Sequence, residues 1–85
     1  MTNRTNITTP FAQQVIQMAR TGCTNLAPGT IREVKKLCDP QYWHSRTAAE
    51  QKLAGKIIAE AVKQGLLPLV HRGLSSEFHL LYERL

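Results

Sequence analysis

Three lysines in the second half of the chain have the spacing that places them together on one face of a helix. Lys52, Lys56 and Lys63 fall within roughly 40° of one another at about 100° per residue, opposite the apolar side of the segment. The same face carries small residues that would let a helix approach a phosphate backbone closely: Ala48, Gly55 and Ala59. An ammonium group binds phosphate as a point charge, so the pattern indicates contact with nucleic acid. The alternative is a solvated face on which Glu60 pairs with Lys56 and Lys63.

The centre of this face carries none of the residue types that read base edges with two hydrogen bonds, so positioning on phosphates is favoured over sequence readout. Candidates for readout lie where the helix begins: Ser45, Arg46 and Gln51. We expect Arg72, at the tip of a predicted hairpin, to contact phosphate or the minor groove. The alternative for Arg72 is an ordinary exposed turn residue. Arg4, near the N-terminus, is a further candidate for the minor groove.

Catalytic and metal-binding motifs are missing from the sequence. It contains no Gly-rich phosphate loop and no nucleophile motif, so we expect neither enzymatic activity nor a cofactor. The cysteines and histidines include no closely spaced pair of the kind that structural zinc sites use, which predicts no metal site: Cys23, Cys38, His44, His71 and His79. We expect both cysteines to be free thiols.

Composition and charge are those of one small, basic, globular domain. Apolar residues make up 42% of the 85-residue chain, and 11 Lys and Arg against 6 Asp and Glu give a net charge of +5. Such a balance favours a polyanionic partner. The longest apolar run, 66–70, is far shorter than a membrane helix, and no signal peptide is recognisable, so a cytoplasmic location is expected. Residues 1–9 are predicted to form a flexible N-terminal arm and residues 10–85 the domain.

Helix caps and apolar spacing predict two helices in the first half of the chain. The first covers residues 10–20, and Gly22 is expected to end it in the left-handed conformation. The second covers residues 30–38, opened by a capping box in which Thr30 and Glu33 satisfy each other's backbone N–H groups.

The third predicted helix covers residues 47–64 and carries the three lysines. Thr47 and Glu50 form a capping box at its beginning, and apolar residues recur at helical spacing along it. About eight residues, 39–46, link it to the second helix.

After this helix the apolar period changes from helical to alternating. Residues 66–71 and 77–83 are predicted strands, joined by a turn at 72–76 into a β-hairpin. The fold class is therefore α+β, a three-helix core followed by a two-stranded hairpin. A domain this small has one core, which we expect to bury Trp43, Leu53, Ile57, Ala61, Phe78 and Leu80.

The order helix, helix, helix, strand, turn, strand over residues 10–83 resembles the winged helix-turn-helix superfamily. The resemblance implies that the third helix enters the major groove and that the hairpin, or wing, touches the backbone or minor groove. The link at 39–46 is longer than the three or four residues of a compact helix-turn-helix. The implied function is a small DNA-binding protein, a transcriptional or mobile-element regulator of prokaryotic or phage type that binds duplex DNA, with a homodimer as one arrangement. The alternative is a protein-interaction module or small inhibitor whose basic face binds an acidic protein.

Overall fold

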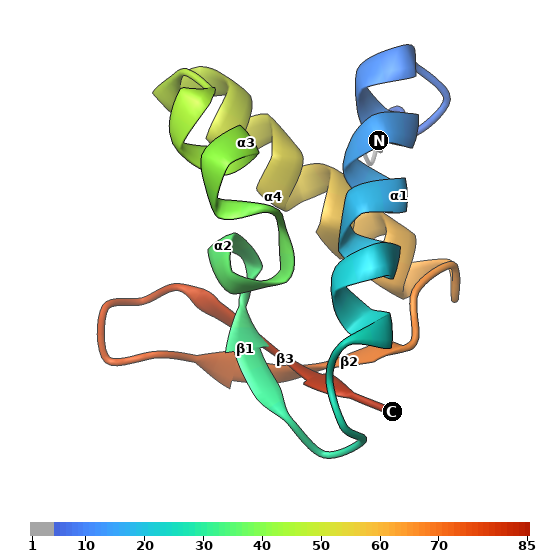
Figure 1. The fold of residues 1–85 in the computed structure, drawn as a ribbon, viewed down its shortest axis with the longest axis vertical. Coiled ribbons are helices and arrows are strands. Elements are labelled where there is room, and N and C mark those ends of the chain that lie inside the picture. Colours follow the sequence, from blue (N-terminus) through green and yellow to red (C-terminus); the bar gives the residue numbers. More distant parts are fainter. Residues whose placement is uncertain (1–4) are drawn as a thin grey trace, which may run out of the picture.

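A computed structural model describes residues 5–85, which form four helices and a three-stranded antiparallel sheet (Figure 1). The elements follow one another as α1 (Pro10–Thr24), β1 (Ile31–Glu33), α2 (Val34–Leu37), α3 (Pro40–Ser45), α4 (Ala48–Lys63), β2 (Leu69–Leu74) and β3 (Leu80–Arg84). The α+β class, with a helical core and a C-terminal hairpin, is confirmed. No helix within residues 5–85 is long and apolar enough to cross a membrane.

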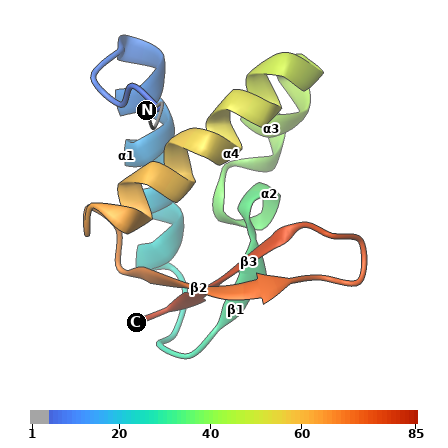
Figure 2. The same cartoon turned by 180° about the vertical axis from the view of Figure 1, so that it is seen from behind.

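The sheet has the order β1-β3-β2, so the last strand of the chain lies in its middle. β2 and β3 form the predicted hairpin, and β1 pairs with the free edge of β3, for example with Arg32 opposite Tyr82. The helices gather on one side of this sheet, and the hairpin extends beyond them (Figures 1 and 2). The sheet therefore lies beneath α2 and α4.

The first helix begins as predicted but ends later. The Thr9 hydroxyl accepts a hydrogen bond from the backbone N–H of Ala12 at 3.1 Å, and the helix continues through Gly22 to Thr24. The prediction that Gly22 ends the helix is wrong. A Cβ atom at Gly22 would lie 1.9 Å from the carbonyl oxygen of Leu37, so glycine is needed there to let α1 approach α2.

The predicted helix at 30–38 and its capping box are also wrong. Residues 31–33 form β1, and only Val34–Leu37 is helical. The physical reason lies in β3, because the backbone N–H of Arg84 donates to the carbonyl of Thr30 at 2.8 Å and draws this segment into the sheet. The 39–46 link, for which no helix was predicted, contains the short helix α3.

The prediction for the third helix is confirmed to within a residue at each end by α4. Its capping box is complete: the Thr47 hydroxyl accepts from the Glu50 N–H at 3.1 Å, and the Glu50 carboxylate accepts from the Thr47 N–H at 3.1 Å. The hydrogen bond from the Thr47 backbone holds the pKa of Glu50 below its usual value.

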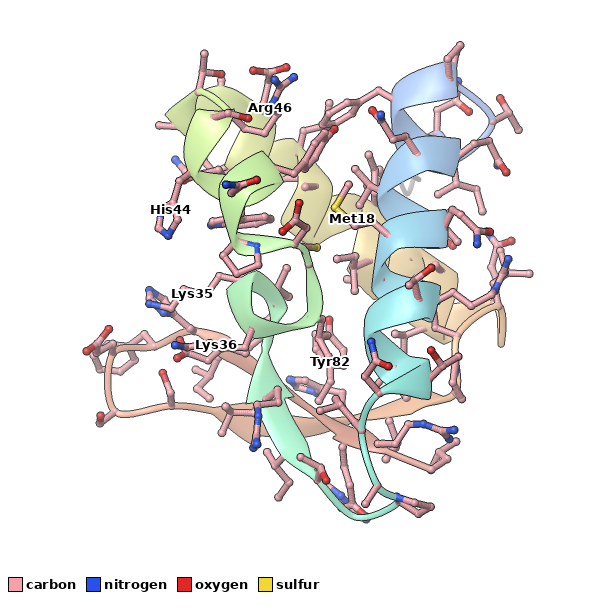
Figure 3. All side chains as sticks on the ribbon, viewed as in Figure 1. Met18, Lys35, Lys36, His44, Arg46 and Tyr82 are labelled. Atoms are coloured by element: carbon pink, nitrogen blue, oxygen red, sulfur yellow. The ribbon has the colours of Figure 1, made fainter. Side chains whose placement is uncertain are left out.

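The core lies between α1, α4 and the sheet, and Tyr82 from β3 is among its largest buried side chains (Figure 3). Ile57 and Ala61 are buried as predicted, and Trp43 and Leu80 are half-buried and pack against the core. Leu53 is 44% exposed, because it lies at the edge of the buried arc of α4. Its predicted burial is wrong.

The turn of the hairpin lies later in the chain than predicted. β2 continues through residues 72–74, and the turn is formed by residues 75–79, with hydrogen bonds between Ser75 and His79. Phe78 therefore belongs to the turn, with a φ of 64° and 81% of its surface exposed, and the prediction that it is buried is wrong. The placement of Arg72 at the tip is likewise wrong, because it lies within β2.

The N-terminal segment before α1 is described from Thr5 onward. Ile7 packs against the core, and its carbonyl accepts a hydrogen bond from the Gln13 side chain at 2.6 Å. Arg4 lies outside the described residues. The flexible arm stays a prediction.

Candidate nucleic-acid interface

The lysine face of α4, defined as Lys52, Lys56 and Lys63, is exposed along its length. The opposite side of the same helix is the side that enters the core: Ala54, Ile57, Ile58 and Ala61 are buried. Because the capping box fixes where the helix begins, the helical period then directs the three ammonium groups into solvent on one side. The structure thus places these three lysines on one exposed helix face, as the sequence predicted.

None of the three lysines of this face is in an ion pair, and within residues 5–85 no lysine is. Glu60, the acid expected to pair with Lys56 and Lys63, instead accepts a hydrogen bond from the Gln64 side chain at 2.8 Å. The alternative interpretation is a solvated face on which Glu60 pairs with Lys56 and Lys63. The ion pairs that it requires are not formed. The three charges are available to an external anion.

Two neighbouring hollows that share Leu80 lie between α4 and the sheet, and together we call them the wing groove. Figure 2 shows α4 crossing in front of α1, above the β2–β3 hairpin. One part has a volume of about 380 Å³ and the other about 330 Å³, and Leu80 lines both. Lys52 lines the first part and Lys63 the second. Two of the three lysines therefore stand at the rim of a concave surface.

Trp43 and Lys35 line the same part of the wing groove as Lys52. Trp43 is half-buried and packs against the core, so it holds α3 in place while part of its surface faces the groove. Figure 3 shows Lys35 projecting on the side of the hairpin tip. Lys35 is a basic residue of this region that our sequence reasoning missed, because the predicted 30–38 helix gave it no relation to the later lysines.

Gly55 lies in the wing groove between Lys52 and Lys56 along the chain. A Cβ atom at this position would meet no atom within 4 Å. Glycine inside a helix costs about 0.5–1 kcal/mol relative to alanine. Packing within the chain does not require this glycine, unlike Gly22, so the open space at Gly55 leaves room for a close approach from outside.

The residues predicted to read bases are engaged in local contacts at the junction of α3 and α4. The Gln51 amide donates to the Trp43 carbonyl at 2.8 Å, and the Ser45 hydroxyl donates to the Tyr42 carbonyl at 2.8 Å. Arg46 forms an ion pair with Glu50 at 3.6 Å and lies 4.8 Å above the Tyr42 ring. These side chains position the beginning of α4, and a base would have to displace their present partners.

Arg72 lies on β2 and is paired within the sheet. Its guanidinium donates to the Glu83 carboxylate on β3 at 2.7 Å, and about half of the Arg72 side chain remains exposed. Arg72 therefore differs from the lysines of α4 in two ways. It lies on a different element, and its charge is already paired with a carboxylate.

The two thiols lie in the core, away from the wing groove. Cys23 and Cys38 are free and buried, with Cys38 packed among apolar side chains as expected. Burial raises the pKa of Cys23, and burial followed by the neighbouring Cys23 raises the pKa of Cys38 to about 11. Both are therefore protonated and unreactive at neutral pH.

Comparison of the chain with protein-family models, with curated proteins and with solved structures gave no match.

Proposed function

We propose that this protein is a small DNA-binding module that holds duplex DNA through the lysine face of α4. The observation that carries the proposal is the arrangement of Lys52, Lys56 and Lys63, which share one exposed helix face beside a groove and form no ion pair within residues 5–85. Duplex DNA presents phosphates in rows, so a row of free ammonium groups releases several counterions at once on binding.

The mode of binding that this arrangement supports is positioning on the backbone. Lysines bind phosphates without regard to sequence, and the nearby Arg46 and Gln51 already have partners within the chain. Gly55 provides space for a phosphate or groove wall to approach the helix. The role we infer is a cytoplasmic regulator that acts by occupying DNA and thereby blocking or recruiting other proteins.

The order of the elements supports the same proposal. A long helix, α4, is followed directly by a hairpin, as the resemblance to winged helix-turn-helix proteins implies. The wing groove lies between these two elements, so a duplex on the lysine face would have the hairpin beside it. A homodimer on paired sites remains an expectation from the sequence.

An acidic protein would find the same free charges on α4, so it is the second candidate partner. A competition experiment separates the two. Protein bound to a labelled random-sequence duplex is challenged with unlabelled duplex, single-stranded DNA, RNA or polyglutamate, and fluorescence anisotropy is followed at low and high salt. We expect duplex to compete best and high salt to release the label. No duplex binding at low salt, or equal competition by polyglutamate, would contradict the proposal and favour a protein partner.

A further inference from the structure

The turn of the hairpin leads into β3 beside the end of β1, and this brings three potential metal ligands together. Glu77 and His79 come from the turn, and Glu33 is the last residue of β1, 46 positions before His79. The turn itself is fixed by hydrogen bonds from the backbone N–H groups of Glu77 and His79 to the Ser75 hydroxyl, at 3.2 and 3.1 Å. The sequence spacing alone predicted no metal site, because it gave no reason to place Glu33 beside this turn.

The ligand atoms of the three side chains lie within 4.8 Å of one another. Nδ1 of His79 is in contact with Oε1 of Glu33 and lies 3.9 Å from Oε2 of Glu77. Ligands bound at about 2.0–2.2 Å to a tetrahedral ion are roughly 3.3–3.6 Å apart. A cation between these atoms would separate Glu33 from His79 and draw in Glu77, whose side chain is 72% exposed.

We propose that Glu33, Glu77 and His79 form a binding site for a divalent cation of the zinc type, with water as the fourth ligand. An imidazole nitrogen combined with two carboxylates suits Zn²⁺ and related ions, whereas Mg²⁺ prefers oxygen ligands alone. The ion would tie the hairpin tip to β1, two segments that meet only because β3 pairs with both other strands.

The site borders the wing groove, since Glu33 and His79 line the part that also contains Lys35 and Lys52. Two carboxylates beside this groove repel phosphate, and a bound divalent cation would neutralise them. This effect on DNA rests on the proposed function. Binding of the cation does not, and it is tested without nucleic acid.

The test is calorimetric titration of Zn²⁺ into the untagged protein, its His79→Gln and Glu33→Gln variants, and a control, His71→Gln, whose histidine lies on β2 outside the cluster. We expect the parent and the control to bind one equivalent, and the two cluster variants to bind at least about tenfold more weakly. Mg²⁺ should bind the parent far more weakly than Zn²⁺. Far-UV circular dichroism without metal checks that each variant is folded.

The proposal is overturned by any of three results. These are no Zn²⁺ binding by the folded parent at millimolar concentration, unchanged affinity in folded His79→Gln, or a decrease in His71→Gln as large as that in His79→Gln. In a folded parent that binds the ion, the NMR signals of Glu33, Glu77 and His79 should move first. Movement confined to other residues would equally contradict the site.

Discussion

The lysine face of α4 and the hairpin beside it both carry charged side chains, but they hold these charges in different ways. On α4, Lys52, Lys56 and Lys63 point into solvent, and no ion pair within residues 5–85 involves them. On the hairpin, Arg72 is paired with Glu83, and His79 contacts Glu33.

The difference decides which region can bind an anion strongly. A phosphate that reaches α4 replaces only water and counterions around the ammonium groups. A phosphate that reaches Arg72 must first compete with a carboxylate 2.7 Å away. The helix should therefore supply most of the affinity for DNA, and the hairpin should contribute only where its own pairs are opened.

The largest expected effect comes from removing the charges of α4. Replacing Lys52, Lys56 and Lys63 together by Gln should lower the affinity for duplex DNA roughly a hundredfold to a thousandfold at low salt, because three phosphates are no longer neutralised. Stability should change by less than about 0.5 kcal/mol per position, since these side chains are on the surface. Anisotropy titrations with several unrelated duplexes measure the decrease, which should be uniform across sequences.

A matched control removes three positive charges from other surfaces. Arg20 lies on α1, Arg32 on β1 and Lys36 in the separate groove between α1 and α2. The triple Gln variant of these residues has the same net charge as the lysine variant and should keep most of the parent affinity. If affinity falls equally in the two triple variants, net charge and not the face of α4 governs binding.

An intermediate effect is expected from releasing Arg72 from its ion pair on the hairpin. Glu83→Gln releases Arg72 from its ion pair, so duplex affinity should rise by up to about tenfold, because one more cation can then bind a phosphate. Arg72→Gln in the parent should change affinity by less than about threefold. A large decrease in Arg72→Gln would show that the paired arginine already binds DNA and would remove the contrast between the two regions.

The smallest effect concerns Gly55 in the wing groove. Gly55→Ala should raise the free energy of unfolding by about 0.5–1 kcal/mol, because alanine is the better helix former and its Cβ would meet no atom outside the surrounding helix backbone. Duplex affinity should nevertheless fall severalfold if DNA approaches the helix at this point. Urea unfolding and anisotropy together test this; a gain in stability with unchanged affinity would place the DNA elsewhere on α4.

The same contrast explains how much of the molecule the sequence could predict. The lysine face was predictable because its determinants are local: the Thr47–Glu50 capping box sets the beginning of α4, and the helical period sets its faces. The burial of Leu53 was predicted wrongly, because the helical period gives the direction in which a side chain points. It does not give how much of the helix surface the neighbouring elements cover.

The sheet side was less predictable because it depends on pairing between distant segments. Thr30 and Glu33 match a helix cap locally, yet the backbone of this segment pairs with β3, about fifty residues later. The turn was misplaced because Arg72 and Gly73 match a turn locally, although the chain turns only at 75–79. The cluster of Glu33, Glu77 and His79 arises from both features, so spacing along the chain could not reveal it.

The most direct test of the central claim is the salt dependence of duplex binding by the parent and by the variant lacking Lys52, Lys56 and Lys63. The slope of log affinity against log salt should be less steep in the variant by roughly three units. Each phosphate that the variant no longer neutralises lowers the slope by about 0.9. An unchanged slope and affinity in a folded variant would contradict the claim that the face of α4 binds DNA.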